Sequence, residues 1–322
     1  MFPLKNDVTI FFAHVAYQMH ERFLLRNTGI RSIQVRNRED LDAQISAADV
    51  LVVSGLWRND LVSLAPKLRF IQAIGAGTDQ FSRDVLKERG IRLASASGVN
   101  ACAVSEHSMA LILAMARRLP EARGNQQKKH WRGMIGDLTQ REDELGGKTL
   151  IIVGVGRIGG RLAQLAKAFD MHVIAFRRDP AAGTNGADEV YGIDQLQVHL
   201  PRADFVALNC PLTTETKGLI NAAAFGAMKR SSFLINCARG RCVDETALAA
   251  ALQAKQIAGA AIDVIYEEPL APDSPLWSLE NAFITPHTAG ETRRYEDNVL
   301  DILIENLERL WRGEATLRNQ VV

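Results

Sequence analysis

The stretch Lys148-Thr-Leu-Ile-Ile-Val153-Gly154-Val-Gly156-Arg-Ile-Gly159 decides the fold of this 322-residue chain. Its first six residues are mostly apolar and β-branched, which predicts a buried strand, and Arg157–Phe169 has the spacing of an amphipathic helix. A strand, a G-x-G-x-x-G turn and a helix in this order form the phosphate-binding corner of a dinucleotide-binding fold. The glycines permit a tight turn and close approach of the pyrophosphate, and the helix N-terminus attracts negative charge. The cofactor contacts expected here are Gly154, Gly156, Arg157, Ile158 and Gly159.

Downstream of this motif, strand-like runs alternate with helix-like stretches as far as residue 285. Such alternation predicts a parallel sheet with helices on both faces, here a Rossmann-type doubly wound α/β domain of six strands. The expected strands are Lys148–Val153, His172–Phe176, Asp204–Leu208, Ser232–Asn236, Ala258–Val264 and Phe283–Thr285. The expected helices are Arg157–Phe169, Ile193–Leu200, Asn221–Met228 and Glu245–Ala254.

The first hundred residues show the same alternation and predict a second, smaller α/β domain. Its expected strands are Val8–Ala13, Ser32–Arg36, Val50–Val53, Phe70–Ile74 and Ile91–Ala94, with short helices at Asp40–Ala47 and Phe81–Glu88.

A long helix connects the two series. Ser105 is expected to cap this helix, Glu106–Leu119, and Pro120 to end it. The polar segment Asn125–Arg141 is expected to be a loop or an arm. The tail Arg293–Arg312 has an amphipathic pattern that suits a return to the first domain. The predicted domains are therefore 1–102 with 291–322, a discontinuous substrate or lid domain, and 103–290, the dinucleotide-binding domain.

Bulk properties limit the class of partner. Lys and Arg number 38 against 37 Asp and Glu, which argues against nucleic acid or an anionic membrane surface. Four cysteines without C-x-x-C or zinc spacing suggest free thiols in a reducing compartment, and no metal is expected. The apolar run Asp7–Val15 suits a buried first strand better than a signal peptide, and Met109–Ala116 is far too short to span a bilayer. A soluble, cytoplasmic protein is the expectation.

The second strand of the cofactor domain is followed by residues that bear on the choice between NAD and NADP. An NAD enzyme usually places a carboxylate here, about 20 residues beyond the glycines, to bind the ribose 2′-hydroxyl. This chain has Arg177 and Arg178, and Asp179 comes two residues late. Guanidinium groups suit a 2′-phosphate, so NADP is favoured over NAD, with solvated arginines at a sheet edge as the alternative.

Three further strands end in residues that suit one reaction. Arg239, Glu268 and His287 follow the strands at Ser232–Asn236, Ala258–Val264 and Phe283–Thr285, so they should meet at one edge of the sheet. Reduction of a 2-oxo acid needs a cation for the carboxylate and ketone, an acid for the new alkoxide, and a group that orients that acid.

The chain resembles the D-isomer-specific 2-hydroxyacid dehydrogenase family, which includes glyoxylate and hydroxypyruvate reductases and phosphoglycerate dehydrogenase. The stretches that carry the resemblance are Gly75-Ala-Gly77-Thr-Asp79, Gly154–Gly159, Pro211-Leu-Thr-Thr-Glu-Thr216, Asn236-Cys-Ala-Arg-Gly240, Asp263-Val with Glu268-Pro269, and Thr285-Pro-His-Thr-Ala-Gly290. The resemblance implies a flavodoxin-like smaller domain, a homodimer formed through the cofactor domain, and hydride transfer from NAD(P)H to a small 2-oxo acid such as glyoxylate or hydroxypyruvate.

The resemblance also implies residue roles. Arg239 binds the carboxylate and carbonyl oxygen, His287 is the acid/base, and Glu268 is its partner. The backbone of Ala76 and Gly77 receives the substrate carboxylate, and Asp263 holds the nicotinamide end. The remaining residues expected near the cofactor are Cys210, Pro211, Thr216, Cys237, Ala238 and Gly290.

Several alternatives remain at this point. Trp57 either caps the substrate pocket or packs in the core of the small domain, and Trp131 is placed on a dimer arm. His14, His107 and His172 are assigned no role. Formate dehydrogenases carry Gln at the position of Glu268, which disfavours that branch. A corepressor-like protein that senses the cofactor and binds partners without catalysis is the alternative from another functional class.

Overall fold

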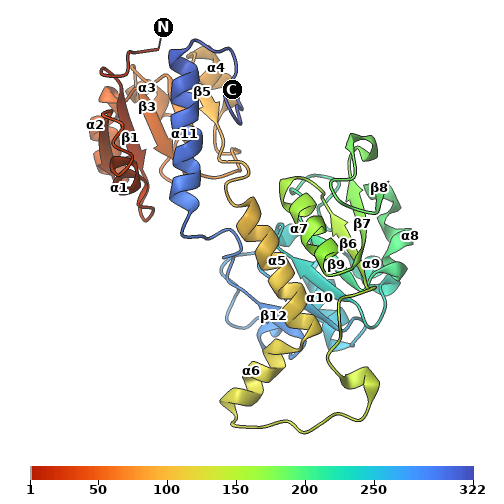
Figure 1. Ribbon diagram of the computed structural model, residues 1–322. Helices are drawn as coiled ribbons and strands as arrows, with labels where there is room; N and C mark the ends of the chain where they lie inside the picture. The colour runs from red at the N-terminus through yellow and green to blue at the C-terminus, as the bar shows by residue number, and fades with distance from the viewer. Residues whose placement is uncertain (1) are drawn as a thin grey trace. The chain divides into compact units, whose positions relative to one another are not determined.

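The computed structural model describes residues 2–322, which form two compact units. Unit 1 contains residues up to Asn100 together with Thr292–Val322, and unit 2 is Ala101–Glu291 (Figure 1). Both units consist of a parallel sheet covered by helices on its two faces. The predicted α/β fold class is therefore confirmed.

The sheet of unit 2 has all its strands parallel, in the order β12-β11-β10-β9-β6-β7-β8. The order reverses between β6 and β9, and ligands of open α/β sheets bind beyond the carboxyl ends of strands at such a point. The strands are β6 (Thr149–Val153), β7 (His172–Arg177), β8 (Glu189–Gly192), β9 (Phe205–Leu208), β10 (Phe233–Asn236), β11 (Gly259–Ile262) and β12 (Ala282–Ile284).

Helices α5 (Ala101–Ala116) and α7 (Arg157–Ala168) cover one face of this sheet. Helices α8 (Leu196–His199), α9 (Ala222–Ala227) and α10 (Glu245–Gln253) cover the other. The α7 helix buries Leu162, Ala163 and Ala166 completely against the sheet. Full burial of a Leu side chain stabilises by roughly 1.5–3 kcal/mol, so this apolar stripe fixes the helix behind the glycine turn.

The start of α5 differs from the sequence prediction. The helix begins at Ala101, so Ser105 lies inside it and the predicted cap is wrong. The Ser105 hydroxyl donates to the Cys102 carbonyl at 2.9 Å, a bond that a serine within a helix can make to its own preceding turn. Pro120 does not end α5 either, because α5 already ends at Ala116 and Pro120 stands in the first turn of α6 (Leu119–Gln127).

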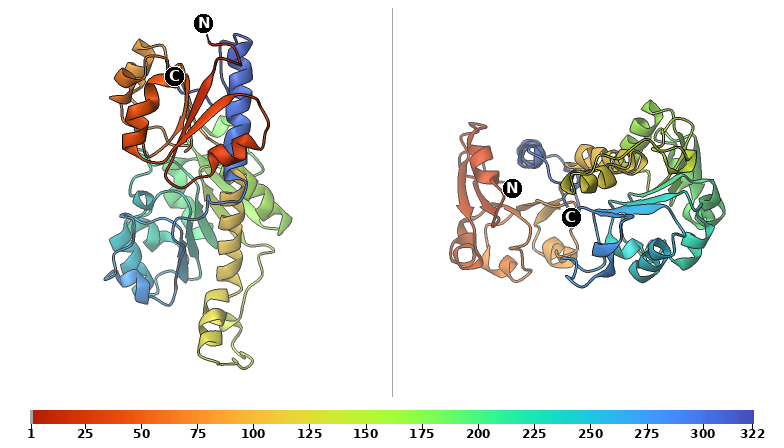
Figure 2. Two further views of the ribbon diagram at one scale, coloured as in Figure 1. Left: turned by 90° about the vertical axis from the view of Figure 1, so that its left-hand side faces the viewer. Right: turned by 90° about the horizontal axis from the view of Figure 1, so that it is seen from below.

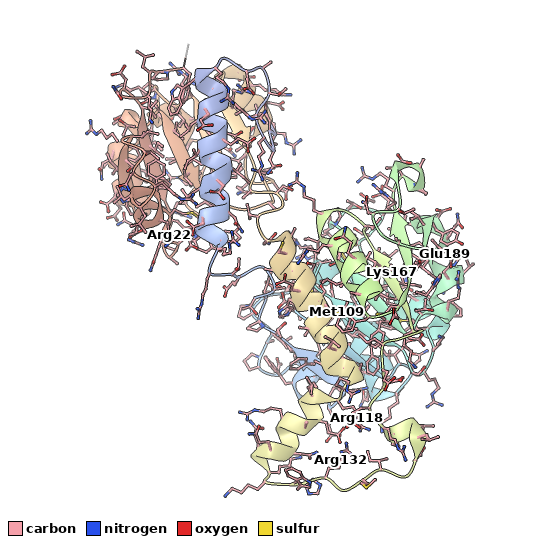
Figure 3. All side chains as sticks on the ribbon, viewed as in Figure 1. Arg22, Met109, Arg118, Arg132, Lys167 and Glu189 are labelled. Atoms are coloured by element: carbon pink, nitrogen blue, oxygen red, sulfur yellow. The ribbon has the colours of Figure 1, made fainter. Side chains whose placement is uncertain are left out.

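Strand β8 was not predicted, so the sheet has seven strands rather than the six expected. Its residues are half-buried at the sheet edge and lack the apolar run of the inner strands. The Glu189 side chain, labelled in Figure 3, holds this edge of the sheet in place. Its carboxylate accepts hydrogen bonds from Arg202 and from the Tyr191 hydroxyl, and it pairs with His172 at 2.6 Å. The contacts with Arg202, Tyr191 and His172 hold the pKa of Glu189 well below its usual value.

Unit 1 has a five-stranded parallel sheet in the order β2-β1-β3-β4-β5, the flavodoxin-like order. Its strands are β1 (Thr9–Ala13), β2 (Arg31–Val35), β3 (Val50–Val53), β4 (Phe70–Ala73) and β5 (Arg92–Ala94). Helices α1 (Met19–Leu24) and α11 (Tyr295–Trp311) pack on one face, and α2 (Arg38–Gln44), α3 (Leu61–Leu64) and α4 (Arg83–Glu88) on the other (Figure 2).

The C-terminal helix α11 is held in unit 1 by apolar and ionic contacts. It buries Val299, Leu300 and Leu303 in the unit 1 core, and Asp297 forms ion pairs with Arg22 and Arg26 of the α1 region. The amphipathic tail therefore completes the first α/β unit across nearly 200 residues of intervening chain.

The Glu189 contacts predict a pH-dependent contribution to stability. Because the folded pKa lies below the unfolded value of about 4.3, the contribution is present above that value and is lost as pH falls toward the folded pKa. We expect Glu189→Gln to lower the free energy of unfolding by about 1 kcal/mol at pH 7 and by progressively less below pH 4. Urea unfolding across this range measures the difference. Glu280→Gln, at an exposed position of the same unit, is the control, and an equal loss at all pH values would contradict the interpretation.

Candidate cofactor and active site

A pocket of about 350 Å³ lies where the strand order of unit 2 reverses. Gly154 follows β6 and Cys210 follows β9, so the loops after these two strands form its walls. The lining residues are Gly154, Val155, Gly156, Phe176, Arg177, Arg178, Asp179, Ile193, Cys210, Pro211, Thr213, Glu215 and Thr216. Of the residues expected near the cofactor, seven line this pocket: Gly154, Gly156, Arg177, Arg178, Cys210, Pro211 and Thr216.

The glycines of the turn fit a bound pyrophosphate. A Cβ on Gly159 would lie 2.1 Å from the Gly154 carbonyl oxygen, so only glycine lets α7 start this close to the turn. A Cβ on Gly156 would meet no protein atom within 4 Å, so the space beside the helix N-terminus is open. An open space at the backbone N–H groups of a helix start is what a phosphate group needs. The residues present therefore fit a dinucleotide.

The opposite wall of the pocket is the loop from Pro211 to Thr216. The buried Thr216 hydroxyl donates to the Pro211 carbonyl at 2.7 Å and accepts from the Thr213 N–H at 2.7 Å. Thr216 thus closes the loop on itself. Cys210 is buried at the start of the loop, and its contact with Cys242 together with burial raises the pKa of Cys210 well above its usual value, which leaves it a neutral thiol.

The two arginines after β7 have different surroundings. Arg177 Nη1 donates to the carbonyls of Ala182 and Gly183 at 3.2 and 2.8 Å, so its guanidinium braces the following loop. Arg178 is exposed on the pocket wall, and its positive charge contributes to the lowered pKa of Glu215, whose main cause is the bond to Thr213. Asp179 also lines the pocket and accepts the Ala181 N–H at 3.0 Å. Arg178 is therefore the better placed of the two arginines to contact a ligand.

His287 and Glu268 form an ion pair at the same edge of the sheet. His287 Nδ1 lies 2.6 Å from Glu268 Oε2, which leaves Nε2 as the ring nitrogen that can face a substrate. The backbone of His287 has φ of 54°, in the left-handed region, and its N–H donates to the Asp263 carbonyl at 2.8 Å. A strained backbone at a site residue persists only where neighbouring contacts hold it.

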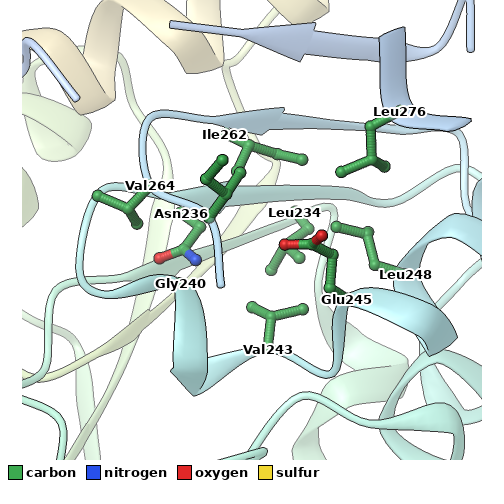
Figure 4. A pocket seen from close by; sticks show the side chains of 10 residues that line it. Leu234, Asn236, Gly240, Val243, Glu245, Leu248, Ile262, Val264 and Leu276 are labelled. Carbon is green, nitrogen blue, oxygen red and sulfur yellow. The ribbon is translucent and has the colours of Figure 1, made fainter. Parts of the chain in front are cut away.

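Arg239 stands directly before a short 3₁₀ turn, Gly240–Cys242, that follows β10. Its Nη1 donates to the Ala238 carbonyl at 2.7 Å, and the residue is exposed. Gly240 packs against the segment after β11, since a Cβ there would lie 1.8 Å from the Ile265 carbonyl oxygen. Figure 4 shows the small, mostly apolar cavity beside this contact, with Gly240, Val264 and Asn236 among the residues that line it. The Arg239 loop and the segment that leads to Glu268 are thus packed together.

Asp263 connects these loops. Its carboxylate is 3% exposed and accepts the Thr288 N–H, the Ala289 N–H and the Thr285 hydroxyl at 3.0, 3.0 and 2.6 Å. His107 of α5 lies 3.1 Å from the same Thr285 hydroxyl. The buried carboxylate therefore fixes the backbone on both sides of His287.

The other predicted residues lie elsewhere. Trp57 is 6% exposed in the core of unit 1, where its ring packs on Phe81 and its Nε1 donates to Asn59, so the structure favours packing over a substrate contact. Ala76 and Gly77 are exposed on the loop after β4 of unit 1. The remaining residues of unit 2 expected near the cofactor, which do not line the pocket, are Arg157, Ile158, Gly159, Cys237, Ala238, Asp263 and Gly290.

Sequence reasoning missed three residues of this site. His107 and Thr285 join α5 to Asp263, and Glu215 shares the pocket wall with Arg178. Thr285 begins the motif Thr285–Gly290, so its place beside His287 in the sequence indicated a position at the site. His107 lies 178 residues away from Thr285, and nothing local to α5 indicates that contact.

Neither a metal cluster nor a membrane span is found between residues 2 and 322. No group of three or more His, Cys, Asp or Glu side chains in this range could hold a metal ion, and no helix in it is long and apolar enough to cross a bilayer.

Comparison with known proteins gives consistent matches. The chain is 36% identical over 286 residues to D-3-phosphoglycerate dehydrogenase of Methanocaldococcus jannaschii, covering 86% of this chain and 52% of that protein. It is 35% identical over 268 residues to glyoxylate reductase of Korarchaeum cryptofilum, covering 82% and 80%. The solved NADPH-dependent glyoxylate/hydroxypyruvate reductase of Sinorhizobium meliloti, in complex with NADP and malonate, superposes with a TM-score of 0.78 at 25% identity over 98% of this chain and 97% of that one.

The chain spans about half the length of the phosphoglycerate dehydrogenases that it matches. Residues 109–289 match the family described as D-isomer specific 2-hydroxyacid dehydrogenase, NAD binding domain. This range includes the whole pocket and all of Arg239, Glu268 and His287. On the matched region and the identity to these relatives, the chain belongs to the D-isomer-specific 2-hydroxyacid dehydrogenase family.

Proposed function

We propose that this protein is an NAD(P)-dependent oxidoreductase that reduces a small 2-oxo acid to the D-2-hydroxy acid. The observation that carries the proposal is the 2.6 Å pair between His287 and Glu268, at the same sheet edge as Arg239 and the dinucleotide pocket. An acid, its orienting carboxylate and a cation are the three groups that ketone reduction requires besides a hydride.

A reduced nicotinamide, when bound, supplies the hydride. Arg239 binds the substrate carboxylate and the carbonyl oxygen, and its charge stabilises the oxygen as negative charge develops there. His287 Nε2–H donates a proton to that oxygen. Glu268 at Nδ1 orients the ring so that Nε2 is the nitrogen that can face the substrate. Asp263 accepts three hydrogen bonds, which leaves capacity on Oδ2 for an amide donor such as a nicotinamide carboxamide.

The substrate we favour is a short 2-oxo acid of the glyoxylate or hydroxypyruvate kind. Its support is the similarity to glyoxylate reductase of Korarchaeum cryptofilum, of which the chain covers 80%. Backbone N–H groups of Ala76 and Gly77 in unit 1 are our candidates for a second contact to the carboxylate, because a glycine-rich turn can present adjacent donors to an anion.

We further propose that NADP is used in preference to NAD. Arg178 is the residue that supports this, since it is exposed on the pocket wall while Arg177 is engaged with the loop carbonyls. Glu215 and Asp179 line the same pocket. The attraction of Arg178 for the 2′-phosphate must therefore exceed the repulsion from these two carboxylates if NADP is to bind more tightly than NAD.

Replacement of His287 tests the proton transfer. We expect His287→Ala to lower kcat by roughly 10²–10⁴ with glyoxylate or hydroxypyruvate, because general acid catalysis contributes about this factor. Oxidation of NADPH or NADH followed at 340 nm measures it, with His20→Ala, at a histidine of unit 1 that has no proposed role in catalysis, as the control. Wild-type protein that binds the cofactor but turns over no 2-oxo acid would contradict the proposal and favour the corepressor-like alternative.

Replacement of Arg178 tests the cofactor preference. Loss of a charge-assisted bond to the 2′-phosphate should raise the KM for NADPH by about 10- to 100-fold in Arg178→Ala and leave the KM for NADH nearly unchanged. Arg177→Ala is the matched control, and it should affect both cofactors alike because it loosens the loop that it braces. An NADPH-to-NADH preference that Arg178→Ala leaves unaltered would rule out Arg178 as the phosphate contact.

The protein is also proposed to form a homodimer through unit 2. The segment 128–138 beyond α6, which extends from the rest of unit 2 in Figure 1, carries Trp131 at 96% and Met134 at 103% exposure. Large apolar side chains so exposed on one short segment are typical of an interaction surface, and a second copy is the partner that the family resemblance implies. A cytoplasmic location, for which the four free thiols are the support, stays a prediction.

Removal of these two side chains tests the dimer. Trp131→Ser with Met134→Ser should shift the protein from dimer to monomer in light scattering coupled to size-exclusion chromatography. Leu25→Ser, at an exposed apolar position of unit 1, is the control and should leave the mass unchanged. A dimer that persists in the double variant would place the interface elsewhere.

A further inference from the structure

The Asp263 carboxylate is buried, and its contacts define a directed chain of hydrogen bonds. An ionised carboxylate only accepts, so the Thr285 hydroxyl must donate its single proton to Asp263 Oδ1 at 2.6 Å. The Thr285 oxygen can then only accept from the ring nitrogen of His107, 3.1 Å away. His107 therefore carries a proton on Nε2, and the chain runs from His107 through Thr285 to Asp263.

This chain of hydrogen bonds ends at Asp263, which contacts the segment that carries His287, the proposed acid. The same Asp263 oxygen that accepts from Thr285 also accepts the Thr288 N–H, and the other oxygen accepts the Ala289 N–H. The Asp263 carbonyl accepts the N–H of His287. Rotation of the carboxylate would release both amides, and the left-handed backbone at His287 would lose its neighbouring restraints.

His107 approaches this segment from a different element. It lies on α5, which packs on strands β10 and β11 of the unit 2 sheet and against α7, the helix after the glycine turn. Its side chain is 23% exposed, and its Nε2 lies 3.6 Å from Asp263 Oδ1. Thr285 stands between the two groups, so α5 reaches the Asp263 carboxylate through one hydroxyl.

We propose that His107 is a positioning residue: its Nε2–H, acting through the Thr285 hydroxyl, holds the Asp263 carboxylate in the orientation that fixes residues 285–289 and with them His287. The effect on turnover rests on the proposed function, whereas the effect on the segment 285–289 does not. If His107 only helped α5 to pack, the loss of its hydrogen-bond donor would not affect the segment 285–289 more than other packing changes in α5 do.

The test compares His107→Gln with His107→Leu. The Gln amide nitrogen can take the place of Nε2–H, whereas Leu keeps the bulk and removes the donor. Amide hydrogen exchange of Thr288 and Ala289 is measured in the full-length protein without substrate, because exchange reports local opening. We expect His107→Leu to speed exchange at both amides by about tenfold, and His107→Gln to restore it to within about threefold of wild type.

Kinetics provide the second measurement. His107→Leu should lower kcat by about tenfold, because the segment that carries His287 loses its restraint. Thr285→Val removes the same link from its other end. If the effect passes through Thr285, adding His107→Leu to Thr285→Val should cause no further loss, so the two effects are not additive.

A core variant of the same helix separates positioning from packing. Ile112→Val, at a fully buried position of α5, lowers stability without touching the chain of hydrogen bonds and should leave exchange at Thr288 and Ala289 unchanged. Exchange at wild-type rates in His107→Leu, failure of His107→Gln to restore it, or additive effects with Thr285→Val would each overturn the proposal. Wild-type protein without turnover would instead defeat the proposed function, while the exchange data would still decide the role of His107.

Discussion

Parallel pairing of the strands of unit 2 in a continuous register is the constraint on which the site depends. Phe176, Val153, Leu208, Asn236, Ile262 and Ile284 form one row across the sheet, each paired with the next. Every strand therefore ends at the same edge, and the residues one to three positions beyond the row emerge there together. The glycine turn, Arg239, Asp263 and His287 share an edge for this reason, although more than 130 residues separate the first from the last.

The buried Asp263 carboxylate adds order that the register alone does not provide. A charged group taken out of water is tolerated only where donors replace the water, and here two backbone N–H groups and a hydroxyl do so. These donors come from the segment around His287. The cost of burying the charge is thus offset by contacts that also hold the backbone of the proposed acid.

The sequence predicted those strands and helices whose buried residues form an apolar run or a regular apolar spacing. Inner strands such as β6 and β9 are buried along almost their entire length and read as apolar runs. The edge strand β8 is only half-buried and is held by the polar contacts of Glu189, so its sequence lacks that pattern. The start of α5 was misplaced because a serine can serve either as a cap or, as Ser105 does, as a donor to its own helix.

By itself, the sequence determined that residues 148–169 form a strand, a glycine turn and a helix, and that Arg239, Glu268 and His287 follow strands of one sheet. Local spacing encodes these features, because each depends on neighbours within a few positions. Only the tertiary structure decided that Arg177 braces a loop while Arg178 lines the pocket, that Trp57 lies in the core of unit 1, and that His107 reaches Thr285. Side-chain direction and contacts across 178 residues depend on how the elements pack, which no local pattern records.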